Sequence, residues 1–393
     1  MAENEKNLNT GTGEPSKPEG KRKRPRRLGL LLGLLLAVLA VVVLTTMEDG
    51  RHFASLRRWL MYGENEASAG RYSYANDSAN RFGRLGDVLV LANSSQISLL
   101  GDDSNVIFDQ AVSLTNPSLS VGGSLAAVCD IGGSGLYVLD REGLVRELPA
   151  DGGLCYYAAR MNAGDYLAVT SQKSGYKAAV TVYDPDGEKV FGFDSHDSYL
   201  ADAVVMPDNK RVAVVSMEPQ DGVFASRLLI YDMATAELTG SCLIRDGMVL
   251  DLACRDRRLV TLCDTGLSVW TTEGDNLLWE DFGSLYLHGC ALTGKDFCAL
   301  LLGRYQSGNV CQLTTWSLEG EAIASLELTE EVLDLSAAGN YLAVLFSDSL
   351  VIYTRDLQEY ARLEDTGYAG HILLGEDGTC LILSGTSAWR YPP

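Results

Sequence analysis

Histidines, serines and glycine-rich loops often take part in catalysis, and in this chain none of them has the spacing of a known catalytic motif. The four histidines form no metal-binding pair such as HExxH; they are His52, His196, His288 and His371. We expect His288 and His371 to be ordinary residues of innermost or neighbouring strands. A ligand role for one of them stays open if the two converge on a central channel.

The remaining motifs point to no known reaction. Gly132-Gly133-Ser134-Gly135 lacks the following helix and Lys-Ser/Thr of a phosphate-binding loop, and Ser94-Ser95 lacks the Gly-x-Ser-x-Gly elbow of a serine hydrolase. Asp and Glu are abundant, so a pair of carboxylates at a channel mouth stays open. We assign no catalytic residue and expect no cofactor and no metal site.

A repeated unit must position whatever residues function here. Residues 163–169, AGDYLAV, return as AGNYLAV at 338–344, which is 175 residues later. Looser copies, each a polar turn followed by about five apolar residues, begin at Leu89, Leu125, Leu167, Val212, Leu259, Cys298, Leu342 and Leu381. Short apolar runs with a period near 42 residues are typical of a β-propeller, in which each blade is a four-stranded sheet. The predicted fold class is therefore all-β.

A second marker supports four strands in each unit. An aromatic residue ends another apolar run at Tyr183, Tyr231, Trp270, Trp316, Tyr353 and Trp389, with Leu139 in the equivalent place. Glycine follows four residues later at Gly143, Gly187, Gly274 and Gly320. These segments predict hairpin turns in which glycine takes a positive φ. We interpret Trp270, Trp316, Tyr353 and Trp389 as packing between blades, in preference to a ligand-stacking ring.

The number of copies predicts the number of blades. Eight copies of the second strand favour eight blades, with seven as the alternative if the Leu89 unit is irregular. The last unit, Tyr368 to Tyr391, has room for only three strands. Tyr72 to Ala75 would supply the fourth, so that both ends of the array share one blade and close the ring. Residues 71–393 are the predicted propeller.

The N-terminal part predicts a membrane anchor. Leu28 to Leu44 contains only Leu, Gly, Ala and Val, and extension to Met47 makes 20 residues, or about 30 Å of helix, enough to cross a bilayer. The basic run Lys21 to Arg27 keeps its own end in the cytoplasm, so the propeller is expected to be extracytoplasmic at the cell membrane. A cleaved signal peptide is the alternative, but the apolar run is long and no small-x-small site follows it.

Composition divides the chain in the same way. Residues 1–47 carry a net charge of +4 and the remainder −24, which makes −20 overall. We expect residues 1–27 to be a disordered basic cytoplasmic tail. Residues 48–70 are either a juxtamembrane stalk or an interfacial helix, and the sequence leaves both open. An acidic ectodomain without a basic patch is not expected to bind nucleic acid.

Nine cysteines follow the predicted span, and none is in a CxxC pair. Those inside predicted strands are interpreted as small buried hydrophobes. One disulfide stays open. If the sixth unit turns near Gly294, Cys290 and Cys298 face one another, and a turn near Tyr305 brings Cys311 beside Cys298.

The order of parts resembles a known group of proteins. A basic tail, an uncleaved anchor and repeats such as Val182 to Phe191, VYDPDGEKVF, are similar to an uncharacterised family of membrane-anchored propellers of Gram-positive bacteria, within the quinoprotein-like and WD40-like propellers. The resemblance covers residues 20–393 and implies an extracytoplasmic eight-bladed fold and no known activity. Quinoprotein dehydrogenases carry an Ala-x-Asp-x-x-x-Gly-x-x-x-Trp motif, of which only fragments such as Gly274 with Trp279 survive, so quinone chemistry is not expected.

Two classes of function follow. The favoured one is a non-enzymatic binding or scaffolding module that recognises an envelope component, either a protein, a peptide or a glycan. The alternative is an exported hydrolase, lyase or quinoprotein-like enzyme that uses channel carboxylates. Carboxylates from several blades that meet at one end of the channel with shifted pKa values would favour the enzyme.

Overall fold

The computed structural model describes residues 71–101, 105–150, 152, 154–220, 223–244, 247–255 and 257–393. The predicted tail, membrane span and juxtamembrane segment lie outside the described residues. Within the described ranges, no helix is long and apolar enough to cross a membrane.

The described residues form eight antiparallel sheets of four strands, as the repeat predicts. Blades 1 to 4 are β2 (Arg81–Leu85), β3 (Val88–Ala92), β4 (Gln96–Leu100) and β5 (Val106–Ala111); β6 (Pro117–Val121), β7 (Ala126–Asp130), β8 (Leu136–Leu139) and β9 (Leu144–Glu147); β10 (Tyr156–Met161), β11 (Leu167–Ser171), β12 (Ala178–Tyr183) and β13 (Lys189–Ser195); β14 (Tyr199–Val205), β15 (Arg211–Gln220), β16 (Val223–Asp232) and β17 (Leu238–Ile244). Blades 5 to 8 are β18 (Val249–Arg255), β19 (Arg258–Cys263), β20 (Gly266–Thr271) and β21 (Asn276–Asp281); β22 (Tyr286–Ala291), β23 (Phe297–Gly303), β24 (Cys311–Ser317) and β25 (Ala322–Leu328); β26 (Val332–Ala338), β27 (Tyr341–Phe346), β28 (Ser349–Thr354) and β29 (Glu359–Glu364); β30 (His371–Leu374), β31 (Cys380–Leu383), β32 (Ser387–Tyr391) and β1 (Arg71–Ser73).

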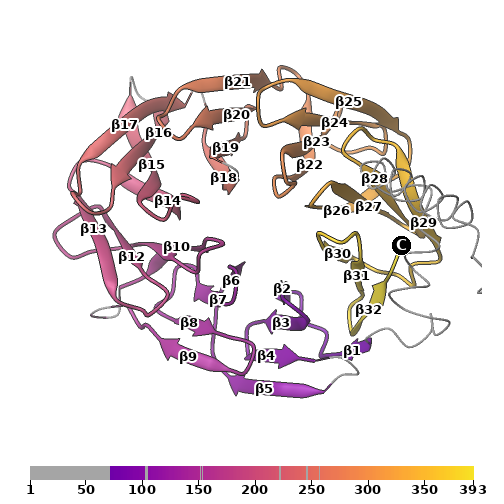
Figure 1. Cartoon of the computed structure of the whole chain (residues 1–393), viewed down its shortest axis with the longest axis horizontal. Helices are drawn as coiled ribbons and strands as arrows, with labels where there is room; N and C mark the ends of the chain where they lie inside the picture. Colours follow the sequence, from indigo (N-terminus) through magenta and orange to yellow (C-terminus); the bar gives the residue numbers. More distant parts are fainter. Residues whose placement is uncertain are drawn as a thin grey trace, which may run out of the picture. The chain divides into compact units, whose positions relative to one another are not determined.

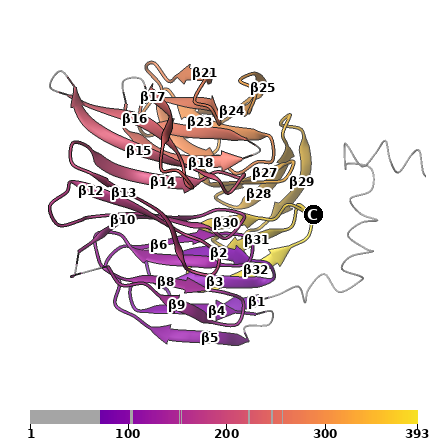
Figure 2. The same ribbon diagram turned by 60° about the vertical axis from the view of Figure 1, so that its left-hand side comes forward.

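The blades are arranged in a ring, with the first strand of each blade nearest the axis (Figure 1). Figure 2 shows the same blades after a turn of 60° about the vertical axis. Because each blade is a meander, its loops lie on two faces. We call the face with the hairpins between first and second strands the turn face. The opposite face, which we call the connection face, carries the loops between second and third strands and the links from blade to blade.

The two ends of the array close the ring as predicted. Strand β1 pairs with β32, with Tyr72 opposite Ala388, and the two strands lie side by side in Figure 1. The Tyr72 side chain is 1% exposed and packs against blades 1 and 8. Just beyond β1, the Tyr74 hydroxyl donates to the carbonyl oxygens of Ser384 and Ser387, at 2.7 and 2.8 Å. Eight blades are thus confirmed.

The repeated aromatic residues pack between blades, as predicted. Each side chain lies in a hydrophobic cluster shared with the preceding blade: Trp270 with blade 4, Tyr353 with blade 6, and Tyr231 with blade 3. Trp316 packs at the edge of the cluster between blades 5 and 6, and Trp389 packs at the edge of the cluster between blades 7 and 8. The core is therefore a series of layers between blades, and each blade depends on both of its neighbours.

The hairpins between third and fourth strands contain the predicted glycines. Gly187, Gly274 and Gly320 have φ values of 84°, 96° and 92°, and a Cβ at Gly274 would lie 2.6 Å from the Cys242 sulfur. Leu357 takes the same place in blade 7 with a φ of 56°, a conformation that costs a β- or γ-branched residue more than glycine.

Polar side chains connect neighbouring blades on the turn face. The Asp165 carboxylate accepts the backbone N–H groups of Ser124 and Leu125 in blade 2, at 2.9 and 3.0 Å. The Asn162 amide donates to the Asn209 side-chain oxygen in blade 4, at 2.7 Å. The first of the two repeated AGDYLAV-like turns therefore joins three blades.

The possible disulfide is wrong. All nine cysteines are free thiols. Cys290 lies opposite Leu300, Cys298 opposite Trp316, and Cys311 opposite Gly303. The hairpins between β22 and β23 and between β23 and β24 are both centred later in the chain than expected. A shift of one residue in the centre of a hairpin changes every cross-strand partner by two residues.

We expect Tyr72→Ala to lower the free energy of unfolding by about 3–5 kcal/mol, because it empties the core between the two ends of the ring. Urea unfolding of the full-length chain in detergent checks this. Ser73→Ala, at an exposed position of the same strand, is the matched control and should change stability by less than about 0.5 kcal/mol. Equal effects of the two variants would contradict the assigned closure.

Mass spectrometry of the denatured chain should find nine alkylated cysteines without any reductant. Alkylation of the native chain should be slow at most sites, because burial raises the pKa of Cys129, Cys254 and Cys263 to about 12 and that of Cys290 to about 11. A mass that rises by two further alkyl groups only after reduction would show a disulfide.

Candidate functional site on the connection face and around the axis

Three innermost strands carry an aspartate at an equivalent irregularity. Strands β14, β18 and β26 each have a register shift against the second strand of their blade, and Asp202, Asp251 and Asp334 follow it directly. One oxygen of each carboxylate accepts the N–H of the next residue, at 2.8 to 2.9 Å. A β-bulge redirects side chains locally, and this one places a carboxylate near the axis.

Arg160 on β10 joins two of these carboxylates. Its guanidinium lies 2.6 Å from an oxygen of Asp202 and 2.7 Å from an oxygen of Asp251, so one side chain links three successive blades. The Asp202 side chain is only 12% exposed. Burial raises the pKa of Asp202, and Arg160 offsets this only in part. Burial alone would lower the pKa of Arg160, but the two carboxylates raise it.

The third aspartate contacts a histidine. The Asp334 carboxylate accepts the N–H of Ile372 at 2.9 Å and lies 3.5 Å from the exposed ring of His371, whose pKa it raises. His288 lies on β22, where its Nε2 is 2.8 Å from the carbonyl oxygen of Tyr305. Both histidines are on innermost strands, as predicted. His371 contacts Asp334 and His288 contacts Tyr305, so the two histidines have different partners. In the part of the chain that is described, no group of three His, Cys, Asp or Glu is arranged to hold a metal ion.

Exposed apolar side chains gather on the connection face of blades 4 to 8. They stand at the starts of innermost strands or in adjoining loops: Tyr199, Met248, Leu250, Leu285, Tyr286, Tyr305, Val310, Leu333 and Tyr368. We call these nine residues the apolar patch. Tyr305 is 74% exposed and Tyr368 is 96% exposed. Among the described residues, the other large apolar side chains that are exposed belong to outermost strands, so the axis-proximal part of this face is distinct.

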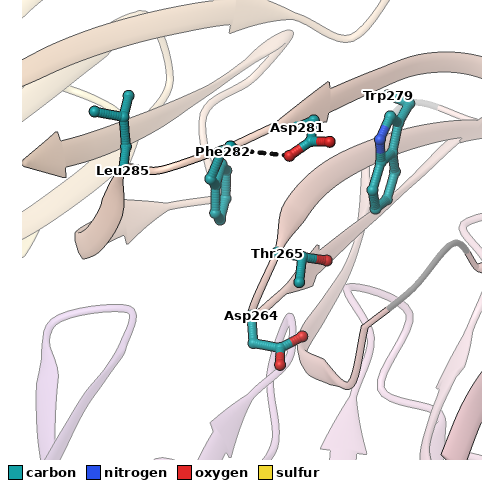
Figure 3. A pocket seen from close by; sticks show the side chains of 7 residues that line it. Asp264, Thr265, Trp279, Asp281, Phe282 and Leu285 are labelled. Carbon is teal, nitrogen blue, oxygen red and sulfur yellow. Dashed lines mark hydrogen bonds between the residues drawn. The ribbon is translucent and has the colours of Figure 1, made fainter. Parts of the chain in front are cut away.

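A pocket of about 310 Å³ lies beside the apolar patch, at the connection-face end of blade 5. Its lining residues are Asp264, Thr265, Trp279, Asp281, Phe282, Gly283 and Leu285. Figure 3 shows the Asp281 carboxylate between the rings of Phe282 and Trp279, with Asp264 and Thr265 across from them. The pocket thus combines two carboxylates with an aromatic wall.

Sequence reasoning missed most of this site. Arg160, Asp202 and Asp251 were not singled out, although an apolar-Asp-apolar triplet recurs at 201–203, 250–252 and 333–335 and could have indicated the aspartates. Arg160 has no equivalent signal. Trp279, noted as a fragment of a docking motif, lines the pocket.

Comparisons with known proteins agree with the fold. The model of a family of unknown function, DUF5711, matches residues 64–281, which is more than half of the chain. No curated protein matches by sequence.

Three solved structures are similar to this chain over most of its length. The C-terminal WD40 domain of Sif2 is 14% identical with a TM-score of 0.57, covering 83% of this chain and 97% of that chain. BamB from Moraxella catarrhalis is 13% identical with a TM-score of 0.53, covering 83% of this chain and 99% of that one. The dihydro-heme d1 dehydrogenase NirN is 17% identical with a TM-score of 0.51, covering 74% and 67%. At these identities the likeness shows the fold alone.

We expect Arg160→Met to cost about 2–4 kcal/mol of unfolding free energy at pH 7.5, because it leaves Asp202 buried without a cation. A carboxyl whose folded-state pKa is raised stabilises the fold while protonated and loses that contribution as the pH rises. Loss of Arg160 raises the pKa of Asp202 further, so the cost of the variant should shrink toward pH 5. Urea unfolding at both pH values checks this.

The matched control is Arg141→Met, which removes an exposed arginine 3.8 Å from Asp87. A surface pair of this kind contributes less than about 1 kcal/mol, with little difference between the two pH values. A cost of Arg160→Met that is equally large at pH 5 and 7.5 would show that Asp202 does not carry the effect.

Proposed function

We propose that this chain, which belongs to the family of unknown function DUF5711, is a binding or scaffolding module whose connection face holds an envelope component. The observation that carries the proposal is the apolar patch. Its nine exposed side chains lie on one face and mostly around the axis, where no part of the described chain covers them. Clustered exposed apolar surface on a folded domain marks an interaction site.

The composition of the patch favours a protein partner. Four of the nine residues are tyrosines, which are enriched at protein interfaces because a ring and a hydroxyl contact apolar and polar groups together. Four side chains of the patch, Tyr199, Leu250, Tyr286 and Leu333, lie on the first residues of innermost strands, which the closed ring holds in place. They therefore lose little conformational freedom on binding. A glycan that stacks on the same tyrosines is the other outcome of the test below.

The proposal includes a location. Leu28 to Met47 is long and apolar enough to anchor the chain in the cell membrane, and the basic residues before it favour a cytoplasmic N-terminus. The propeller then stands in the extracytoplasmic space, and its partner is an envelope protein or glycan.

An exported enzyme that uses axial carboxylates is the second candidate. Asp202 and Asp251 come from neighbouring blades, and the pKa of Asp202 is raised, which is the arrangement that such an enzyme needs. Against it, both carboxylates are within 2.7 Å of the same guanidinium, and Asp202 is nearly buried. A general acid or base would have to leave Arg160 before it reached a substrate.

Photo-crosslinking in the cells that make the protein tests the proposed function. A p-benzoylphenylalanine at Tyr305 should give a discrete crosslinked product, which protein or glycan staining would classify. The matched control is the same group at Leu238, which is 50% exposed but lies on an outermost strand. The same products from both positions, or none from either, would overturn the proposal.

A further inference from the structure

We infer that the pocket of blade 5 binds an arginine side chain of the partner, and that the apolar patch beside it binds the apolar residues that flank this arginine. The inference rests on the proposed function, because it names the chemistry of the partner at the same face. It commits the partner to a polypeptide.

Backbone hydrogen bonds fix the shape of the pocket. The N–H of Phe282 donates to the Thr265 carbonyl oxygen at 2.9 Å, which holds the link between blades against the loop between β19 and β20. Gly266 lets Trp279 pack closely against the chain, because a Cβ there would lie about 3 Å from two atoms of the indole ring. The aromatic wall is therefore built into the blade.

Backbone N–H groups hold both carboxylates of the pocket in place, and each carboxylate has further lone pairs that can accept hydrogen bonds. One Asp281 oxygen accepts the N–H of Gly283 at 2.7 Å, and one Asp264 oxygen accepts the N–H of Met248 at 2.8 Å. Neither side chain has an ion-pair partner among the described residues, although seven arginines of the described ring pair with a carboxylate. Both side chains are exposed, so a cation from outside reaches them.

The surroundings add to the negative charge. Glu280 precedes Asp281 on β21, and its pKa is raised by burial and by the charge of Asp281. No lining residue of the pocket is basic. An anionic partner would therefore be repelled, and a cationic group would be attracted.

Arginine fits this pocket better than other cations. Its planar guanidinium presents several N–H donors to a carboxylate and can stack on an aromatic face, here that of Trp279. A metal ion lacks the planar shape that lets a guanidinium stack on the indole. Met248 and Leu285 border the two sides of the pocket, and Tyr286 follows directly, so the residues next to the arginine meet apolar surface.

The test uses the tripeptide acetyl-Leu-Arg-Tyr-amide as the probe and calorimetry of the full-length chain in detergent. The citrulline analogue keeps the shape of arginine without its charge, and we expect it to bind about tenfold more weakly or not at all. Asp264→Asn and Asp281→Asn should each weaken the arginine peptide by a similar factor, since asparagine keeps an oxygen for the backbone N–H. Asp275→Asn, an exposed aspartate at the turn-face end of the same blade, should change nothing.

Equal binding of the arginine and citrulline peptides, or no binding of either, would overturn the inference. Photo-crosslinking at Tyr305 then separates it from the proposed function. If Tyr305 still gives a product in the cell and Asp264→Asn with Asp281→Asn leaves that product unchanged, the face binds a partner without an arginine. If the product is also absent, the proposed function fails as well.

Discussion

The structure depends on the pairing of β1 with β32, because no blade of a propeller buries its own two faces. Each hydrophobic layer lies between two sheets, and a ring with one open junction would expose a layer on both sides of the gap. Tyr72 fills the last layer, and the segment that supplies it begins the described part of the chain. The N-terminal end of the ring is therefore held beside its C-terminal end, whatever precedes it.

The side chains of the two faces of the closed ring differ in what they contact. On the turn face, Asp165 and Asn162 satisfy backbone or side-chain groups of the neighbouring blades, so these two polar side chains help to hold the ring together. On the connection face, apolar side chains and the carboxylates of Asp264 and Asp281 remain accessible. A face whose groups are not needed by the fold is the one that remains free for a partner, and this is the physical basis of both proposals.

The axis shows how a charged cluster is retained at a site that is partly buried. Asp202 and Asp251 would repel one another, and Asp202 would bear the cost of burial, without the guanidinium of Arg160 between them. The Arg160 guanidinium offsets the cost of burying these carboxylates, and it also takes up their hydrogen-bonding oxygens. This constraint favours a structural role for the cluster over proton transfer, and it leaves the exposed pocket of blade 5 as the better candidate for recognition.

The repeat in the sequence determined the fold almost completely. The period near 42 residues, the aromatic residue near the end of six of the eight third strands and the glycines of the hairpins are local signals, and each marks a strand or a turn on its own. Even the closure by Tyr72 followed from counting strands in the last unit. The cross-strand partners of Cys290 and Cys298 did not, because loop lengths set register and these turns lie later than the sequence indicates. Arg160 is 42 residues from Asp202 and 91 residues from Asp251 in the chain. Asp264 follows β19, and Asp281 is the last residue of β21. Such groups meet only when blades close into a ring and loops settle on one face, so only the tertiary structure decided where the candidate site lies.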